Sequence, residues 1–308
     1  MKKTGVILNP GAKKFRTGRD SISSYSKYNS DKVFVSAPQS VEDLKAIAEQ
    51  YKKEKIDYLC IGGGDGTIHL VLSELVNVYH PEQVPPVLIL KGGTMNNIAR
   101  TVKNKGEGSG ILKRLIKKIE KNEIIQTKER LTIKVNNKFC FLFGTGFITN
   151  FLEKVYSGTE KGFLRNLQVG FMAIKEVFKN VKNCEIIKLT EQAVFIDNKK
   201  ILINPVSGIL AGTVEHIGMG FSPLKDAVRG DGTFQIIILG LPASKIMLNL
   251  NKLRTGKKIK SPKYSNLSGK SIHIKHKGTF TYTMDGEIYT AENELKIESG
   301  PIIRLVKI

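Results

Sequence analysis

The first third of the chain alternates short apolar runs with segments in which apolar residues recur at helical spacing. The apolar runs are Gly5–Leu8, Lys32–Ser36, Asp57–Ile61 and Val87–Leu90. Helical patterns begin at Ser40 and cover Ile68–Val78. Continuously apolar runs are typical of buried parallel strands, and short strand–helix connections favour a parallel sheet with helices on both faces. The pattern predicts an N-terminal α/β domain of the Rossmann-like type.

From about residue 130, short segments of strand type separated by turn residues replace this alternation. They are Leu131–Val135, Phe139–Phe143, Ala193–Ile196, Lys200–Ile203, Phe234–Leu239, Ser271–Lys275 and Thr279–Thr283. One helical pattern, Phe163–Val181, interrupts them. The spacing predicts a mostly antiparallel, β-sandwich-like domain. We therefore expect domains at residues 1–128 and 129–294, with residues 295–308, which contain the strand pattern Ile302–Val306, returning to the first domain.

The composition is that of a globular protein with an unusual charge. The 308 residues, 41% of them hydrophobic, are enough for two packed cores. Chains with a net charge as high as +21 meet nucleic acid, anionic membranes or anionic substrates, or simply carry many solvated lysines. Only 7% of the residues are aromatic, and no helix-turn-helix, zinc-finger or RNP pattern occurs. We therefore expect no nucleic-acid partner.

The remaining sequence features point to a cytoplasmic protein. The three cysteines are widely spaced without a CxxC pattern, which favours buried free thiols in a reducing compartment. No run of 18 apolar residues occurs, and the first apolar run is broken at Asn9-Pro10, as expected of a first strand and not of a signal peptide.

The stretch LCIGGGDGTIH, residues 59–69, follows the third apolar run and is rich in glycine. Glycine turns after strands let backbone N–H groups bind phosphate. The P-loop and dinucleotide patterns are both absent, because no lysine follows the glycines and Thr67 stands where a third glycine belongs. Asp65 would repel phosphate unless a divalent cation accompanies it or its carboxylate faces the reacting hydroxyl. The stretch indicates phosphoryl transfer, with a plain glycine turn closed by Asp65 as the alternative.

Two further turns follow other strands of the predicted sheet. Lys91–Asn97 is again rich in glycine, and Asn9–Gly11 ends the first apolar run. Ligands of parallel sheets bind at the carboxyl ends of the strands, where all three turns fall. Together they predict one polyphosphate site.

These loops resemble the diacylglycerol kinase catalytic-domain family, which includes bacterial diacylglycerol kinases and sphingosine and ceramide kinases, with NAD kinases as distant relatives. The resemblance rests on GGGDGT, a GT-x-N loop and an NP turn, and it continues through the second domain. The matching segments there are Phe143–Phe147, Ile217–Pro223 with Ala227 and Asp231-Gly232, and Met284–Glu287.

The resemblance implies ATP and Mg²⁺ and assigns roles to residues of this chain. Asp65 would lie near the γ-phosphate and metal, and Glu287 would act as general base on a lipid hydroxyl. Asp285 would act beside Glu287, holding an arginine, a metal ion or the substrate, and Asp231 would hold a structural Mg²⁺. The residues expected to contact ATP are Asn9, Pro10, Gly11, Ser36, Gly63, Gly64, Asp65, Gly66, Thr67, Gly93, Thr94 and Asn96.

The sequence departs from the family pattern at two turns. Asn97 stands where the family commonly has an acid, and the first turn reads NPGAKK, in which Lys13 and Lys14 are alternative phosphate contacts. These departures leave open a catalytically weakened protein that binds nucleotide or anionic lipid. An NAD kinase-like phosphotransferase is the other alternative.

The resemblance favours an ATP-dependent kinase of diacylglycerol or a related lipid, peripheral to the inner membrane surface. Such a kinase would meet its lipid substrate at an anionic membrane, with the nucleotide between the domains and the lipid tail against Phe147, Phe151 and Phe163. The amphipathic stretch Gly110–Asn122 predicts a helix that packs its apolar stripe on the first domain and shows lysines to water or anionic lipid. The lysine-rich stretch Lys252–Lys263 would add to that attraction. The oligomeric state stays open, a homodimer included.

Overall fold

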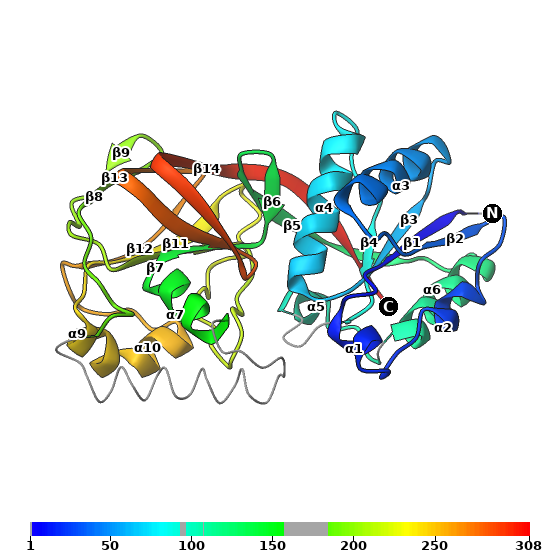
Figure 1. Ribbon diagram of the computed structural model, residues 1–308, viewed down its shortest axis with the longest axis horizontal. Helices are drawn as coiled ribbons and strands as arrows, with labels where there is room; N and C mark the ends of the chain where they lie inside the picture. The colour runs from blue at the N-terminus through cyan, green and yellow to red at the C-terminus, as the bar shows by residue number, and fades with distance from the viewer. Residues whose placement is uncertain (1, 93–96, 107, 157–183) are drawn as a thin grey trace. The chain divides into compact units, whose positions relative to one another are not determined.

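The fold is described from a computed structural model that places residues 2–92, 97–106, 108–156 and 184–308 (Figure 1). The chain forms two compact units: unit 1 comprises residues 1–132, 137–139 and 301–308, and unit 2 comprises residues 133–136 and 140–300. The chain leaves unit 1 within β5 (Gln126–Val135) and returns within β14 (Glu287–Lys307). The predicted boundary at residue 128 falls within β5.

Unit 1 is built on a parallel sheet. Its strands lie in the order β2-β1-β3-β4, and Leu305 near the end of β14 pairs in parallel with Val87 of β4. The strands are β1 (Thr4–Leu8), β2 (Val33–Ser36), β3 (Tyr58–Gly62) and β4 (Val87–Ile89). Every residue of β1, β3 and β4 is buried, as expected of a sheet covered on both faces, which confirms the predicted α/β arrangement.

Helices cover both faces of this sheet. On one face, α3 (Val41–Lys53) and α4 (Asp65–Tyr79) pack together (Figure 1). The Tyr51 ring of α3 lies so close to β1 that a Cβ on Gly5 would be 2.5 Å from it. On the other face lies α6 (Gly108–Glu120), whose Ile111, Leu112, Leu115 and Ile119 join Val6 and Leu8 in the core. The predicted packing of this apolar stripe on the first domain is thus confirmed. Short helices α1 (Lys13–Arg16), α2 (Ser23–Ser26) and α5 (Asn97–Val102) complete the unit.

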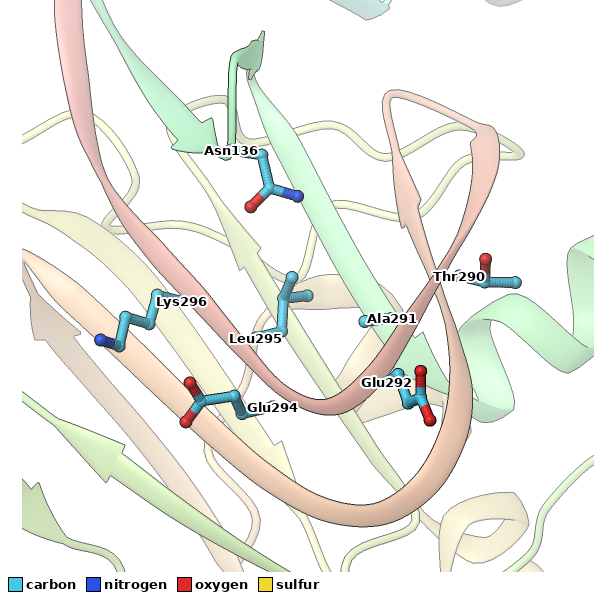
Figure 2. A pocket seen from close by; sticks show the side chains of 7 residues that line it. All are labelled: Asn136, Thr290, Ala291, Glu292, Glu294, Leu295 and Lys296. Carbon is cyan, nitrogen blue, oxygen red and sulfur yellow. The ribbon is translucent and has the colours of Figure 1, made fainter.

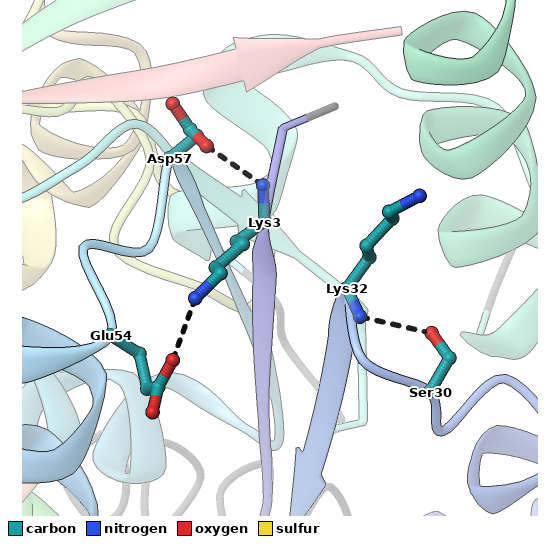
Figure 3. Close-up of polar contacts among 5 residues, drawn as sticks. All are labelled: Lys3, Ser30, Lys32, Glu54 and Asp57. Atoms are coloured by element: carbon teal, nitrogen blue, oxygen red, sulfur yellow. Dashed lines mark hydrogen bonds and ion pairs between the residues drawn. The ribbon is translucent and has the colours of Figure 1, made fainter.

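Polar contacts fix the strands at their amino-terminal edge (Figure 3). The Lys3 ammonium lies 2.7 Å from the Glu54 carboxylate, and the Lys3 backbone N–H donates to Asp57 at 2.7 Å. The Lys32 N–H donates to the Ser30 hydroxyl at 3.3 Å just before β2. Polar groups at this edge are therefore bonded to other residues of the chain. The predicted phosphate turns all lie at the opposite, carboxyl-terminal edge.

Unit 2 is antiparallel. Its strands lie in the order β12-β11-β10-β7-β13-β14, and β8 pairs with β13 and β9. Because β8 pairs with residues 272–276 of β13 and β7 with residues 282–284, the sheet divides along β13. A Cβ on Gly269 of β12 would lie 2.6 Å from Ile196 of β8, so the two parts face each other in the predicted sandwich-like way. The strands are β7 (Leu142–Gly146), β8 (Gln192–Ile196), β9 (Lys199–Lys200), β10 (Gly208–Gly212), β11 (Phe234–Leu239), β12 (Tyr264–Gly269) and β13 (Ser271–Met284).

Several strands differ from the sequence pattern for local reasons. The apolar run Phe139–Phe143 is split between β6 (Lys138–Cys140) and β7, because the N–H groups of Phe141 and Leu142 donate to the Asp285 carboxylate. The segments Ser271–Lys275 and Thr279–Thr283 form the single strand β13, with an irregularity between Lys275 and Thr279. The predicted strand Lys200–Ile203 ends at Lys200, and the Phe163–Val181 helical pattern lies outside the described residues.

Helices α7 (Phe147–Tyr156), α9 (Ala243–Leu248) and α10 (Leu250–Thr255) belong to unit 2. In the part of the chain that the structure describes, no helix combines the length and apolarity needed to cross a membrane. All three cysteines are free, and Cys60 and Cys140 are buried as expected while Cys184 is half-buried.

His69 is a buried histidine of unit 1, and we expect it to make the stability of this unit depend on pH. Its buried Nδ1 lies 2.8 Å from the Phe139 carbonyl oxygen, so the neutral ring donates this hydrogen bond. Burial lowers the pKa of His69 to about 4, and the Lys138 charge lowers it further against the opposing hydrogen bond.

Because the unfolded chain binds a proton near the ordinary histidine pKa, the stabilising effect of neutral His69 should be present at neutral pH and lost as the pH falls toward 4. The lowered pKa of His69 corresponds to a contribution of roughly 3 kcal/mol to the free energy of unfolding. Urea unfolding of the chain and of His69→Gln, compared at neutral and mildly acidic pH, measures it. An identical pH dependence in the two proteins would rule out His69 as the titrating group.

Candidate functional site

The first and third strands of unit 1 are tied together at their carboxyl ends by Asn9. Its backbone N–H donates to the Gly62 carbonyl at 2.9 Å, and its side-chain amide donates to the Thr67 hydroxyl at 2.8 Å. The Asn9 side-chain oxygen accepts from the N–H of Gly11 at 2.8 Å, which fixes the Asn9–Gly11 turn. The two turns predicted to bind phosphate, Asn9–Gly11 and Gly62–Thr67, therefore lie side by side.

The loop after β4 begins against the same turn. The N–H of Gly92 donates to the Gly63 carbonyl at 2.8 Å, and a Cβ on Gly92 would lie 2.8 Å from the Cα of Gly63. The two backbones can approach this closely because Gly92 has no side chain. Three predicted site residues of this loop, Gly93, Thr94 and Asn96, lie outside the described residues.

The start of α4 provides hydrogen-bond donors at the centre of this cluster. The N-cap is Gly64, which has no side chain to accept from the first N–H groups of the helix. These groups lack acceptors within any α-helix, and the positive end of the helix dipole adds to their attraction for an anion. Residues 64–67 are half-exposed, so an anionic group can reach this end of the helix.

Asp65 is the first residue of α4 and lies beside the start of α5. One of its carboxylate oxygens accepts from the Ile98 N–H at 3.3 Å. A carboxylate here suits Mg²⁺, which is commonly held by one or two protein carboxylates together with substrate phosphates and water. Among the described residues no group of three or more His, Cys, Asp or Glu side chains gathers, so phosphate and water oxygens would have to complete the shell.

Ser36 ends β2 and contacts a buried phenol. Its hydroxyl lies 3.0 Å from the Tyr51 hydroxyl, which also lies 2.8 Å from the Phe34 carbonyl oxygen and 3.0 Å from that of Val6. Burial raises the pKa of Tyr51 to about 12, so the phenol keeps its proton. Sequence reasoning missed Tyr51, and the predicted contact of Ser36 with nucleotide stays a prediction.

In unit 2 a two-residue turn joins β13 to β14 and presents Glu287. Asp285 and Gly286 both have positive φ, 50° and 96°, and Met284 pairs with Glu287 across the turn. The Asp285 carboxylate accepts from the N–H groups of Phe141 at 3.1 Å and Leu142 at 2.9 Å. Asp285 is buried and anchors the turn to the start of β7, whereas Glu287 is exposed.

Two tyrosines lie near Glu287, and sequence reasoning missed both. The Tyr156 hydroxyl at the end of α7 donates to the Gly286 carbonyl at 2.9 Å. Tyr289 follows Glu287 on the same strand face and stacks on Tyr282, with ring centroids 5.6 Å apart. Burial raises the pKa of Tyr156, and that of Tyr289 to about 12, and the negative charge of Glu287 adds to both. The one signal available from the sequence concerned Tyr289, because the spacing Glu287-x-Tyr289 in a strand places both side chains on the same face.

The other predicted residues of unit 2 serve local structure. One oxygen of the exposed Asp231 accepts from the Thr233 N–H at 3.0 Å and from its hydroxyl at 2.6 Å, which lowers the pKa of Asp231. This is an Asx turn, and a metal role for Asp231 stays a prediction. Phe147 and Phe151 pack, half-buried, against the unit 2 core, and Phe163 lies outside the described residues.

A hollow of about 300 Å³ lies on unit 2 along β14 and contains none of the predicted site residues (Figure 2). Its charged lining is Glu292, Glu294 and Lys296, and Glu294 is already bonded to His273 at 2.8 Å. The hollow therefore adds nothing to the chemistry of the predicted site.

Comparison with known proteins finds a family match in the first part of the chain and relatives along most of its length. Residues 3–126 match the model of the diacylglycerol kinase catalytic domain. A Staphylococcus aureus protein named "Putative lipid kinase" is 26% identical over 266 residues, which cover 82% of this chain and 77% of that protein. A Staphylococcus epidermidis protein of the same name is 24% identical over 292 residues, which cover 91% and 86%.

Among solved structures, that of a "putative diacylglycerol kinase" from Bacillus anthracis superposes with a TM-score of 0.68. The alignment covers 100% of this chain and 97% of that one at 16% identity, so it shows the shared fold. The catalytic-domain match assigns residues 3–126 to the diacylglycerol kinase catalytic-domain family, and the similarity to proteins named lipid kinases extends over most of the chain.

Proposed function

We propose that this protein is an ATP-dependent lipid kinase that transfers the γ-phosphate to the hydroxyl of diacylglycerol or a related lipid. The observation that carries the proposal is the cluster at the carboxyl edge of the unit 1 sheet. There the Asn9 side chain is bonded to Thr67 at the first turn of α4, and Gly92 packs on Gly63. Backbone N–H groups that converge on one helix start are suited to a polyphosphate.

Unit 1 would bind the triphosphate through its turns. The first N–H groups of α4 would bind phosphate oxygens, while Asn9 and Thr67 hold the flanking turns at fixed spacing. Asp65 would supply the protein ligand of Mg²⁺, and the ion would neutralise charge on the phosphates during transfer. In this proposal, metal binding is the reason that an aspartate lies inside a phosphate loop.

Glu287 would accept the proton of the lipid hydroxyl. As that proton passes to the carboxylate, the hydroxyl oxygen bonds to the γ-phosphorus, the bond from phosphorus to the bridging oxygen breaks, and ADP leaves. Asp285 would act through its bonds to the Phe141 and Leu142 N–H groups, which hold the turn that presents Glu287. Asp285 is thus a positioning residue in this proposal.

A transfer assay with γ-labelled ATP and Mg²⁺ on vesicles containing diacylglycerol, monoacylglycerol and sphingoid bases tests the function. Label should enter a lipid, and Asp65→Asn and Glu287→Gln should each reduce kcat by about 100-fold or more, since general-base catalysis alone contributes roughly that much. Glu298→Gln, which neutralises another exposed acid of β14, is the matched control and should leave kcat unchanged.

Three outcomes would contradict this proposal. Label in soluble NAD but in no lipid would identify an NAD kinase. ATP binding without transfer to any acceptor would identify a nucleotide-binding protein that lacks catalysis. Equal activity of Glu287→Gln and Glu298→Gln would remove Glu287 from the reaction.

Gly92→Ala tests the contact between the two glycine loops. The added methyl group meets the Gly63 backbone, which cannot move without shifting the phosphate turn, so we expect a stability loss of roughly 1–3 kcal/mol. Calorimetry should show Mg²⁺-ATP affinity reduced by about tenfold or more, because the same shift displaces the donors.

Gly110→Ala is the matched control, because its added Cβ has no atom within 4 Å. Gly110 lies in α6, so the Gly110→Ala variant should be more stable by about 0.5–1 kcal/mol, with its ATP affinity unchanged. Normal ATP affinity in Gly92→Ala would show that this contact does not shape the nucleotide site.

Tyr156→Phe removes the hydrogen bond to Gly286 while keeping the ring. The turn that presents Glu287 then loses one bond, so kcat should fall about fivefold with KM for ATP unchanged. Tyr264→Phe removes another phenol of unit 2, one bonded to Asn266, and should not change kcat. Similar kcat losses in both variants, or an altered KM for ATP in Tyr156→Phe, would contradict the positioning role.

A further inference from the structure

Residues 243–263 of unit 2 form a surface segment with charges of one sign. The segment contains α9, α10 and the chain that leads to β12 (Figure 1). It contains no acidic and no aromatic residue. Its seven cationic side chains are all exposed: Lys245, Lys252, Arg254, Lys257, Lys258, Lys260 and Lys263.

These cations have no partner within the described parts of the chain. None of the seven forms a side-chain hydrogen bond or an ion pair there, in contrast to Lys118, which pairs with Glu123 beside α6. Lys225 adds to the group, because a Cβ on Gly256 would lie 2.5 Å from its side chain. The segment is therefore a dense positive surface whose charges are not paired by any of the residues that the structure describes.

The apolar residues of the segment divide into an inner and an outer set. Ala243, Ile246 and Ile259 are buried in the unit 2 core, where Met247 and Leu253 pack against them. Leu248, at the junction of α9 and α10, is 78% exposed instead. Single exposed leucines are common on protein surfaces, but this one lies within the segment that carries the unpaired cations.

We propose that residues 243–263 dock on an anionic lipid bilayer, with the lysines at the headgroups and Leu248 entering the boundary with the acyl chains. Basic residues attract anionic headgroups electrostatically, and an exposed aliphatic side chain gains by leaving water. A nucleic acid would be attracted by the same charge but offers nothing to Leu248, and the segment has no aromatic ring on which a base stacks. The chemistry therefore favours a bilayer.

This inference extends the proposed function and is tested separately from it, because vesicle binding requires no phosphoryl transfer. The measurement is cosedimentation of the full chain with vesicles of phosphatidylcholine and phosphatidylglycerol, beside vesicles of phosphatidylcholine alone. Binding should require phosphatidylglycerol and weaken with salt. The triple variant Lys252→Gln, Lys257→Gln and Lys258→Gln should bind about 100-fold more weakly, and Leu248→Ser about fivefold more weakly.

The matched control removes the same charge from unit 1. Lys113→Gln, Lys117→Gln and Lys121→Gln, combined, change three exposed lysines of the α6 region and should reduce binding far less. An equal loss in both triple variants would overturn the proposal in favour of diffuse attraction by the net charge. Tight duplex DNA binding, lost in the Lys252 triple variant and unaffected by Leu248→Ser, would overturn it in favour of a nucleic-acid surface.

Discussion

The backbone contact between Gly63 and Gly92 is the constraint on which the candidate site depends. Strands β3 and β4 are neighbours in a parallel sheet, so the loops that follow them start one strand spacing apart. A side chain at Gly92 would push these loops apart, because its Cβ would lie 2.8 Å from the Gly63 backbone, and a Cβ on Gly63 would lie 2.4 Å from the Thr67 side chain. With glycine at both positions, the loops hydrogen-bond to each other, and the start of α4 stays accessible at their junction.

Asn9 extends this constraint to a third strand end. Its backbone and side chain together bond to Gly62, Thr67 and Gly11, so one residue fixes the distance between the first turn and the helix start. Residues that hold backbone donors in place in this way reduce the reorganisation needed when a charged ligand binds. Asp285 in unit 2 has a similar role. Its carboxylate accepts a hydrogen bond from the backbone N–H of Leu142 at the start of β7, while the nearby Glu287 stays exposed.

The sequence was most informative where backbone geometry depends on residue type. Continuous apolar runs predicted the parallel strands, and the glycine turns predicted which strand ends carry the site, because glycine is required where backbones approach closely. Strands β10 and β12 escaped prediction because the glycines of β10 and the serines, asparagine and glycine of β12 have little strand preference, and both strands are fixed by pairing with β11. The contacts of Asp285 with Phe141 and Leu142, and of Tyr156 with Gly286, join residues more than a hundred positions apart, and no local pattern encodes them.

The cationic side chains have different surroundings in different parts of the chain. In α6 the apolar side joins the core, Arg114 donates to the carbonyl of Lys105, and acidic Glu120 and Glu123 lie among the lysines. Packing of the apolar side in the core and hydration of the charged side account for the residue pattern of that helix. In residues 243–263 the inner side chains join the core, but the outer cations repel one another and form no ion pair with an acid in the described parts of the chain. Solubility is served as well by mixed charges, which avoid this repulsion. A polyanionic surface that meets this segment therefore explains its one-sign charge better than solubility does.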